Sequence, residues 1–355
     1  MNPKFHPLQV IDIKHETEDA VSIAFSIPDT LTEAFSFYAG QYITIKAIIN
    51  GEEVRRSYSI CAAPHENTLR VAIKRVENGI FSTWATNDLK IGDSLEVMTP
   101  SGNFKLIPTA TNQKSYVLFA AGSGITPILS IIKTILKEEP LSEVTLFYGN
   151  KGFSSIIFRE ELETLKNLFM KQFRLIHILS RESLGNVIQK GRIDDEKVRK
   201  LCSGFLNPAA TDEVYVCGPE AMIHAVKNEL NAFGVPEKQI HFELFGTGYV
   251  KQEKKEVAVS DIVASKVTII LDDDRYEINL DSNGKNILEA GFEAGADLPY
   301  ACKGGVCCTC KAKIIEGTAT MDINYALEKE EVEAGYILTC QAHPTSSNLI
   351  ISFDE

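Results

Sequence analysis

The sequence predicts a multidomain protein in which an all-β barrel is followed by a doubly wound α/β domain and then by a small α+β domain. Residues 8–105 carry regularly spaced strand patterns, and residues 112–245 alternate between strand and helix patterns. Near the end of the chain, four cysteines have the spacing of a metal site. A length of 355 residues is enough for two or three domains. We expect domains at 1–108, 109–245 and 263–355, with a linker at 246–262.

The composition is typical of a globular protein with well-filled cores, since 44% of the residues are hydrophobic and 24% are charged. The first residues contain no apolar signal segment, and no apolar run approaches the length of a membrane span. We therefore expect a cytoplasmic protein that has no membrane partner. The eight cysteines are too few for a disulfide-rich fold, in agreement with a reducing compartment.

The negative charge is concentrated near the end of the chain. Of the net charge of −12, residues 264–355 contribute −9, from 16 acidic and 7 basic residues. The preceding residues contribute −3, from 32 acidic and 29 basic residues. This charge serves either solubility or an acidic docking face for a more basic redox partner. A nucleic-acid partner is not expected, because the chain has no basic stripe. The sequence predicts no oligomeric state.

The first domain is predicted to be a small β-barrel. In the stretch 20–28, Val21, Ile23, Phe25 and Ile27 alternate with other residues and so share one face of a strand. Asn50-Gly51 is a hairpin turn signal. Further strands are expected at 41–48, 55–60, 69–76 and 94–99.

The second domain is predicted to hold a parallel sheet with helices on both faces, because its strand and helix patterns alternate. Strands are expected at 116–121, 144–148, 174–179, 213–217 and 240–244. Helices are expected at 126–137, 154–170, 195–201 and 220–233. Residues 246–262 have little core potential. After them, a hairpin is expected at 266–271 and 276–280, and a helix at 286–294.

The cysteine spacing predicts a plant-type [2Fe–2S] site. Cys302, Cys307 and Cys310 form C-x4-C-x2-C, and Cys340 follows after a gap of 29 residues. A zinc site usually takes paired C-x2-C units, and disulfides need an oxidising compartment that nothing else in the chain indicates. Cys308 lies off the spacing, so we expect it not to bind iron.

Two glycines suit the cysteine loop. Gly304 and Gly305 can take positive φ without steric cost and bring backbone N–H groups close to the cluster sulfurs.

In the barrel, two short motifs point to a ligand that carries both a flat ring and phosphates. Strand alternation places Arg56 and Tyr58 on one face, next to Ser59. An arginine beside an aromatic ring can contact a phosphate and a flat ring together. The turn at Gly79-Ile80-Phe81-Ser82 can cradle a second phosphate with its N–H groups. Alone, the first motif is equally an ordinary surface strand.

In the second domain, two strand–helix junctions point to a dinucleotide. Gly122-Ser123-Gly124-Ile125-Thr126-Pro127 opens one helix, and Cys217-Gly218-Pro219 opens another. Glycines let the backbone approach a pyrophosphate, and a helix N-terminus favours its charge. A lone glycine-rich turn is common, and Cys217 by itself is equally a small buried hydrophobe.

The paired motifs resemble those of the ferredoxin–NADP reductase superfamily. The resemblance implies that Tyr58 stacks on the isoalloxazine, Ser59 bonds to its edge and Arg56 contacts the pyrophosphate, with support from the turn of Gly79, Phe81 and Ser82. It implies FAD as the flavin. In the nicotinamide half, it implies nucleotide contacts from Gly122, Gly124 and Gly218, with Thr126 lining the nicotinamide site and Cys217 beside the point of hydride transfer. Tyr58, Ser59 and Cys217 are thus the predicted catalytic residues.

Phe245 and Glu243 follow from the same resemblance. In several superfamily members an aromatic at the Phe245 junction packs on the second flavin face, although a phenylalanine packed in the core or against the linker is an equal alternative. Glu243 either tunes flavin protonation or faces water.

The nicotinamide is predicted to be NADPH rather than NADH. Ser180-Arg181 ends a strand, and Lys190 or Arg192 supplies a second cation for a 2′-phosphate. An acid for the ribose hydroxyl of NADH is present only one residue later, at Glu182. The alternative is that Arg181 and Arg192 are ordinary surface charges.

Over its full length, the chain resembles reductase subunits of multicomponent bacterial oxygenases that carry the ferredoxin last. Within that set it most resembles the reductases of phenylacetyl-coenzyme A epoxidases, through RSYSIC, AAGSGITPIL, CGPEAM and ADLPYACKGGVCCTCKAK. The resemblance implies an FAD-binding barrel, an NAD(P)H-binding α/β domain and a β-grasp ferredoxin domain. Cys308 departs from that pattern, because a small residue is expected there.

The implied function is electron transfer from NADPH through FAD and the [2Fe–2S] cluster to a separate di-iron oxygenase, in phenylacetate degradation. The aromatic substrate binds the oxygenase, so no residue of this chain identifies it. The alternatives are the reductase of a 3-ketosteroid 9α-hydroxylase, that of another ring-hydroxylating oxygenase, or a redox-sensing binding module without turnover.

Overall fold

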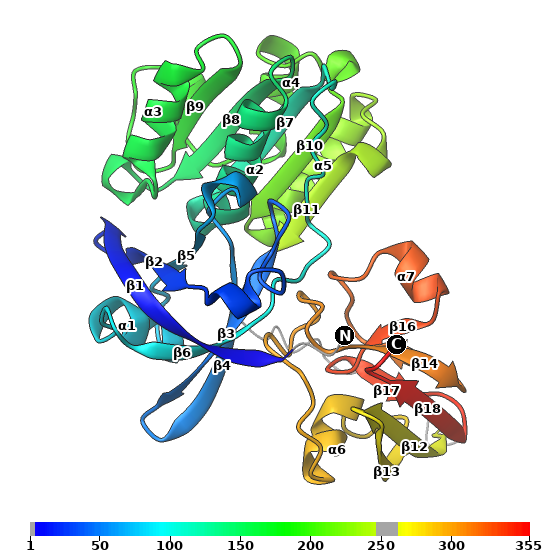
Figure 1. The fold of residues 1–355 in the computed structure, drawn as a ribbon. Helices are drawn as coiled ribbons and strands as arrows, with labels where there is room; N and C mark the ends of the chain where they lie inside the picture. Colours follow the sequence, from blue (N-terminus) through cyan, green and yellow to red (C-terminus); the bar gives the residue numbers. More distant parts are fainter. Residues whose placement is uncertain (1–3, 246–261) are drawn as a thin grey trace.

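The computed structural model describes residues 4–245 and 262–355. All of the predicted linker except its last residue lies outside these ranges. The described chain folds around three main sheets, each in its own part of the molecule (Figure 1). The barrel lies between the α/β domain and the C-terminal domain, as the predicted fold class requires. Within the described ranges, no helix is long and apolar enough to cross a membrane.

The barrel is one antiparallel sheet of six strands, in the order β4-β3-β6-β1-β2-β5. Asn50 and Gly51 both take positive φ, 53° and 84°, in the tight turn that joins β3 to β4, so the predicted hairpin is confirmed. The strand bounds are β1 Phe5–Thr17, β2 Ala20–Ser26, β3 Tyr42–Ile49, β4 Glu52–Ser59, β5 Leu69–Lys74 and β6 Ser94–Met98.

Helix α1, Ile80–Asn87, was not predicted from the sequence. The segment after Gly79 was expected to be a turn, whereas Gly79 is the residue that precedes a helix. Phe81 and Ala85 on this helix are buried in the barrel core. A helix of eight residues is too short for its periodicity to be seen against the surrounding strand patterns.

The α/β domain holds a parallel sheet in the order β11-β10-β7-β8-β9. The chain moves outward from β7 to β9, then returns to place β10 on the other side of β7. The turns after β7 and β10 therefore meet at a topological switch point. The strands are β7 Ser115–Ala121, β8 Glu143–Asn150, β9 Phe173–Leu179, β10 Glu213–Gly218 and β11 Ile240–Leu244.

Helices cover both faces of this sheet. The core on one face includes α2 and α3, and the core on the other includes α4 and α5. Their bounds are α2 Ile125–Glu138, α3 Arg159–Leu168, α4 Asp195–Gly204 and α5 Glu220–Ala232. The prediction of one helix over 154–170 was wrong, because Phe158 takes a left-handed φ of 59° and α3 begins only after it.

The C-terminal domain has a mixed sheet in the order β13-β12-β18-β14-β16, with α6 packed on it through Ile287 and Leu288. The cysteine loop connects α6 to β14. The elements are β12 Ala264–Leu271, β13 Asp274–Asp281, α6 Ile287–Glu293, β14 Lys311–Glu316, β15 Ala319–Met321, α7 Lys329–Glu333, β16 Tyr336–Leu338, β17 Ala342–Pro344 and β18 Asn348–Ser352.

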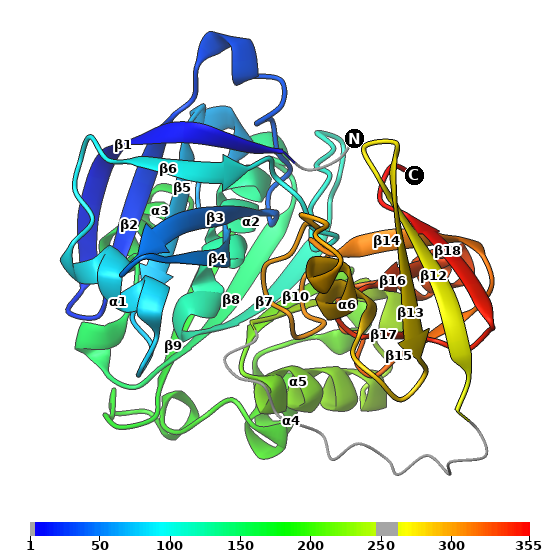
Figure 2. The same ribbon diagram turned by 90° about the horizontal axis from the view of Figure 1, so that it is seen from below.

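The barrel and the α/β domain share one core, whereas the C-terminal domain has its own. Ala39, Cys61 and Phe104 of the barrel region belong to the same buried cluster as Ile128 and Leu129 of α2. Figure 2 shows the C-terminal domain beside the barrel, with the loop between α6 and β14 on the side that faces β3 and β4.

Candidate functional site

The two flavin motifs of the barrel meet in space. The ring of Tyr58, at the end of β4, lies 5.5 Å from the ring of Phe81 on α1, measured between centroids. Phe81 packs edge-on against Trp84. Burial raises the pKa of Tyr58, and the nearby charge of Arg56 opposes the shift. The phenol therefore stays neutral at physiological pH and offers a half-buried flat face.

The turn before α1 is closely packed. The backbone N–H of Val76 donates to Ser82 Oγ at 3.2 Å, which ties the helix back to the strand side of the turn. A Cβ atom at Gly79 would overlap both Ser82 and Val76, so only glycine fits. Arg56 is exposed and donates to the carbonyl of Arg55 at 2.7 Å. Glycine backbone and a free cation suit a phosphate, and these contacts remain predictions.

Ser59 has a partner that the sequence did not indicate. Its hydroxyl donates to Glu243 Oε2 of β11 at 2.9 Å, joining the flavin motif to the α/β domain. Burial raises the pKa of Glu243 to about 8, and the hydrogen bond from Ser59 lowers it in part. Glu243 is thus a half-buried acid that can hold a proton beside the predicted flavin edge, as one of the two expectations for it required.

Glu243 should make stability depend on pH. Its folded pKa of about 8 lies above the ordinary value of 4.5, so its stabilising contribution is complete below pH 4.5 and is lost as pH rises through 8. We expect the melting temperature of the flavin-free protein to fall over this window more steeply than that of Glu243→Gln. Thermal unfolding from pH 4.5 to 8.5 measures the difference. Exposed Glu237→Gln is the control, and equal slopes in wild type and Glu243→Gln would reject the assignment.

The two nucleotide junctions touch at the switch point. A Cβ atom at Gly124 would overlap the carbonyl oxygen of Cys217 and lie 3.0 Å from the backbone nitrogen of Gly218. Gly122 takes a φ of +55°, and its carbonyl accepts a hydrogen bond from Tyr148 at 3.0 Å. The backbone at this point is therefore held open and rigid, as a pyrophosphate or nicotinamide requires.

The side chains at this crevice are buried. Thr126 Oγ1 donates to the carbonyl of Ser123 at 3.1 Å, which closes the first turn of α2. Cys217 is fully buried, and burial raises the pKa of its thiol, so the thiol stays protonated. The buried Nδ2 of Asn150, at the end of β8, has no hydrogen-bond partner in the part of the chain that the structure describes. Such an unused donor at the strand ends fits a ligand oxygen.

The predicted 2′-phosphate residues gather at the end of β9. The N–H of Ser180 donates to Asn150 and that of Arg181 to Lys151, which extends β9 alongside β8. Lys190 lies across a parallel bridge from Leu179, so Arg192 returns to the same corner. The side chains of Arg181, Lys190 and Arg192 are all exposed there.

Phe245, the last residue described before the gap, packs against the core shared by the barrel and the α/β domain. This position fits the expectation of a core phenylalanine, and its contact with a flavin stays a prediction.

The four predicted cluster ligands converge. Cys302 Sγ lies 3.1 Å from Cys307 Sγ, and Cys340 is hydrogen-bonded to both Cys302 and Cys310. The neighbouring thiol of Cys307 and backbone N–H groups, including that of Gly304 at 3.3 Å, lower the pKa of Cys302. Four sulfurs in hydrogen-bond contact, with N–H donors around them, fit a [2Fe–2S] cluster.

One glycine of the loop behaves as expected and the other does not. Gly305 takes a φ of +72°, and a Cβ atom there would lie 2.8 Å from the carbonyl of Ile323. Gly304 does not take a positive φ; Lys303 does, at 52°. The thiol of Cys308 donates to the carbonyl of Ala326 at 3.3 Å, so it is engaged away from the four ligands.

The cysteine loop is docked on the flavin strands. Tyr42 of β3 is buried, and its hydroxyl accepts a hydrogen bond from the backbone N–H of Cys308 at 3.0 Å. The hydroxyl of Thr309 lies 3.4 Å from that of Thr44, which lies 3.0 Å from that of Ser57. Because Ser57 belongs to the flavin motif, hydrogen-bonded atoms connect the two predicted redox sites.

Charged groups complete this interface. The buried guanidinium of Arg55 pairs with Asp297 at 3.1 Å and lies 4.4 Å from the ring centroid of Tyr300. Asn103 donates to Glu331 at 2.6 Å. These residues were missed from the sequence, since each contact joins positions more than 200 residues apart. A buried arginine directly before Arg56 carries no local signal of its partner.

Three family models match the chain in the order of its domains. An oxidoreductase FAD-binding domain matches residues 7–106, an oxidoreductase NAD-binding domain matches 118–228, and a 2Fe-2S iron–sulfur cluster binding domain matches 269–345. FAD and a [2Fe–2S] cluster are therefore the cofactors of the chain, and the nucleotide is a nicotinamide one.

Curated relatives match over nearly the full length. The chain is 44% identical to the reductase-type E component of the 1,2-phenylacetyl-CoA epoxidase of Escherichia coli, over 99% of this chain and 98% of the relative. It is 31% identical to the "3-ketosteroid-9-alpha-monooxygenase, ferredoxin reductase component" of Rhodococcus rhodochrous, over 98% and 96%.

Solved structures share the arrangement. Phthalate dioxygenase reductase matches with a TM-score of 0.60 at 24% identity, over 98% of each chain, and this likeness shows the fold. The flavohaem-like FAD/NAD-binding domain of nitric oxide dioxygenase from Vibrio cholerae matches with a TM-score of 0.59 at 26% identity, over 68% of this chain and 99% of that one.

Proposed function

This chain belongs to the FAD- and [2Fe–2S]-containing reductase components of multicomponent oxygenases, and from that premise we propose that it draws electrons from NADPH in the cytoplasm and supplies a phenylacetyl-CoA epoxidase. It is an oxidoreductase in which electrons pass from FAD to the [2Fe–2S] cluster. The nucleotide, the compartment and the identity of the oxygenase are the proposed parts.

The observation that carries the proposal is the docking of the cysteine loop on the flavin strands. FAD, when bound, accepts two electrons as a hydride and releases them one at a time. Tyr42 and Thr44 hold Cys308 and Thr309 against the strand that carries Ser57. The chain thereby keeps its two redox sites in contact without relying on diffusion.

We assign the roles in the flavin and nicotinamide sites on the geometry described above. Tyr58 supplies the stacking face, Ser59 and Glu243 hold a proton beside the ring edge, and the backbone near Gly79 receives phosphate. On the other side, Gly124 and Cys217 shape the crevice in which the nicotinamide approaches the flavin. These side chains bind, orient and exclude water, while the redox chemistry belongs to the cofactors.

The choice of oxygenase rests on relatedness. Identity to the epoxidase component is 44%, against 31% for the ketosteroid monooxygenase component, at nearly equal coverage. The test is to combine the reductase and NADPH with purified oxygenase components and to measure the products. Phenylacetyl-CoA epoxidation is the expected result. Efficient steroid hydroxylation without phenylacetyl-CoA epoxidation would reject the proposal in favour of the ketosteroid pathway.

NADPH is favoured by the orientation of Glu182 and by the cations around it. The Glu182 carboxylate accepts the N–H of Phe153 at 3.0 Å, so it is engaged away from the ribose hydroxyl that an NADH site would bind. Arg181, Lys190 and Arg192 are exposed at the same corner. A hollow of about 190 Å³ beside them is lined in part by Lys190 and Arg192.

Replacing Arg181 with Ala should weaken NADPH about tenfold or more and leave NADH within about twofold, because a charge-assisted hydrogen bond contributes about 1.5–3 kcal/mol. Dissociation constants for both nucleotides, taken from the concentration dependence of flavin reduction, measure the effect. Exposed Arg174, on the same strand β9, supplies the control Arg174→Ala. If Arg181→Ala weakens both nucleotides equally, the 2′-phosphate role is wrong.

A further inference from the structure

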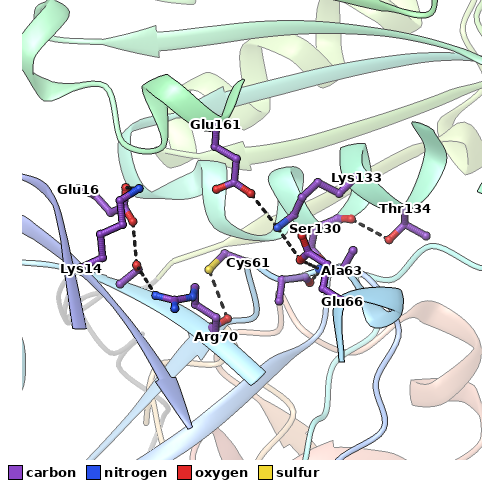
Figure 3. Close-up of polar contacts among 12 residues, drawn as sticks. Lys14, Glu16, Cys61, Ala63, Glu66, Arg70, Ser130, Lys133, Thr134 and Glu161 are labelled. Atoms are coloured by element: carbon purple, nitrogen blue, oxygen red, sulfur yellow. Dashed lines mark hydrogen bonds and ion pairs between the residues drawn. The ribbon is translucent and has the colours of Figure 1, made fainter. Parts of the chain in front are cut away.

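A buried lysine joins the two domains that hold the flavin and nicotinamide sites. Lys133 of α2 lies between Glu66, which ends the short turn after β4, and Glu161 of α3 (Figure 3). Its Nζ lies 2.7 Å from Glu66 Oε2 and 3.0 Å from Glu161 Oε1. The Lys133 side chain is only 9% exposed. Since Glu66 belongs to the barrel and Glu161 to the α/β domain, one of the two ion pairs crosses the domain boundary.

Neighbouring bonds fix the barrel side of this contact. Glu66 Oε2 also accepts the backbone N–H of Ala63 at 2.7 Å, and Ser130 Oγ of α2 donates to the carbonyl of Ala62 at 2.6 Å. Burial lowers the pKa of Lys133, but Glu161 and Glu66 outweigh it and hold the pKa above its ordinary value. The lysine is therefore charged, paired and largely removed from water, which makes the loss of either carboxylate costly.

Both arms of this contact lead directly to the redox sites. From Glu66 the chain runs back through the buried residues Cys61 and Ile60 to Ser59. From Lys133, α2 runs back through buried residues to Thr126 at the nucleotide turn. Packed segments of this kind transmit displacement instead of absorbing it, because protein interiors are close-packed. A change at Lys133 thus moves the predicted nicotinamide and flavin sites relative to each other.

We propose that Lys133 and Glu66 are positioning residues that set the distance and angle between the nicotinamide and the flavin. The inference rests on the flavin and nicotinamide positions assigned under the proposed function. The step concerned moves a hydride, one proton with two electrons, from reduced nicotinamide to flavin. The C–H bond breaks, a bond from that hydrogen to the flavin forms, the nicotinamide is oxidised and the flavin is reduced. Neither residue touches either cofactor; each acts through the segment that it holds.

Two matched variants of the holoenzyme test the proposal. Glu66→Gln removes the ion pair that crosses the boundary, whereas Glu161→Gln removes the one inside the α/β domain, and each leaves Lys133 with one carboxylate. Stopped-flow reduction of the flavin at saturating NADPH should be about tenfold slower in Glu66→Gln, because a reaction geometry that is off by a fraction of an ångström loses rate steeply. It should stay within about twofold of wild type in Glu161→Gln.

Two further readouts separate positioning from general damage. The dissociation constant of NADPH should change less than about twofold in both variants, so the loss falls on the rate and not on binding. The long-wavelength absorbance of the nicotinamide–flavin complex, which reports ring overlap and not turnover, should weaken only in Glu66→Gln. Lys133→Arg, which keeps both carboxylates paired, should restore most of the rate that Lys133→Met loses.

Equal slowing in Glu66→Gln and Glu161→Gln, or no slowing in either, would overturn the proposal. If Glu66→Gln fails to retain FAD, Glu66→Asp and Glu161→Asp serve in its place, since each keeps the charge and shortens only the reach. A several-fold slowing confined to Glu66→Asp supports positioning, and its absence rejects it. A wild-type protein that NADPH does not reduce would instead refute the proposed function itself.

Discussion

Replacing Cys340 with Ser should abolish the visible absorption of the cluster and block electron delivery to the oxygenase, while flavin reduction by NADPH stays within about twofold. Cys340 is buried and is hydrogen-bonded to both Cys302 and Cys310, so its loss removes one of four converging sulfurs. A serine hydroxyl does not ionise in this range and is a poor ligand for iron. Visible and electron paramagnetic resonance spectra measure the cluster, and stopped-flow absorbance at flavin wavelengths measures the first step.

Cys308→Ser is the matched control, because this thiol lies in the same loop but donates to the carbonyl of Ala326. It should retain the cluster. Cluster loss in Cys308→Ser with retention in Cys340→Ser would reverse the ligand assignment. Loss of flavin reduction in Cys340→Ser with FAD still bound would show that the domains do not act as separate modules.

Replacing Gly124 with Ala should weaken nicotinamide binding about 100-fold, since misplacement by about 1 Å at such a site costs on that order. The added Cβ would overlap the carbonyl oxygen of Cys217 and approach the backbone nitrogen of Gly218, and neither backbone atom can rotate away. The two turns at the switch point must then separate. Titration of flavin reduction against NADPH and NADH gives the dissociation constants.

Gly204→Ala is the control for this change, because Gly204 ends α4 in the same domain and a Cβ there meets nothing within 4 Å. It should bind both nucleotides like wild type. Normal nucleotide binding by a folded Gly124→Ala protein would show that the nucleotide does not use this crevice.

Local pattern was enough to predict the fold class, because each domain repeats one period. Alternation marks the barrel strands, and the change to alternating strands and helices marks the α/β domain. The errors fall where tertiary contacts override that pattern. Helix α1 is too short to show a period, and the left-handed Phe158 delays the start of α3 although the sequence before it looks helical.

The candidate site was predictable where its residues are close in sequence. The flavin motif, the glycine turns and the cysteine loop each hold their residues within one segment. The pairs Tyr42–Cys308 and Ser59–Glu243 join distant segments, and no spacing in the sequence indicates them. Lys133 did leave a signal, since a lone charge in the apolar run of α2 must find a partner when buried, but the partner itself lies in another domain.

The contact between the cysteine loop and Tyr42 has a consequence for competition between partners. Because the C-terminal domain is covalently attached to the barrel, the barrel face is present at an effective concentration on the order of mM. A few hydrogen bonds, such as that from Cys308 to Tyr42, can then keep the loop docked although they would not hold two free proteins together. An oxygenase that approaches the cluster from the side of Cys308 and Thr309 must therefore outcompete a tethered rival, and its own concentration decides how often it succeeds.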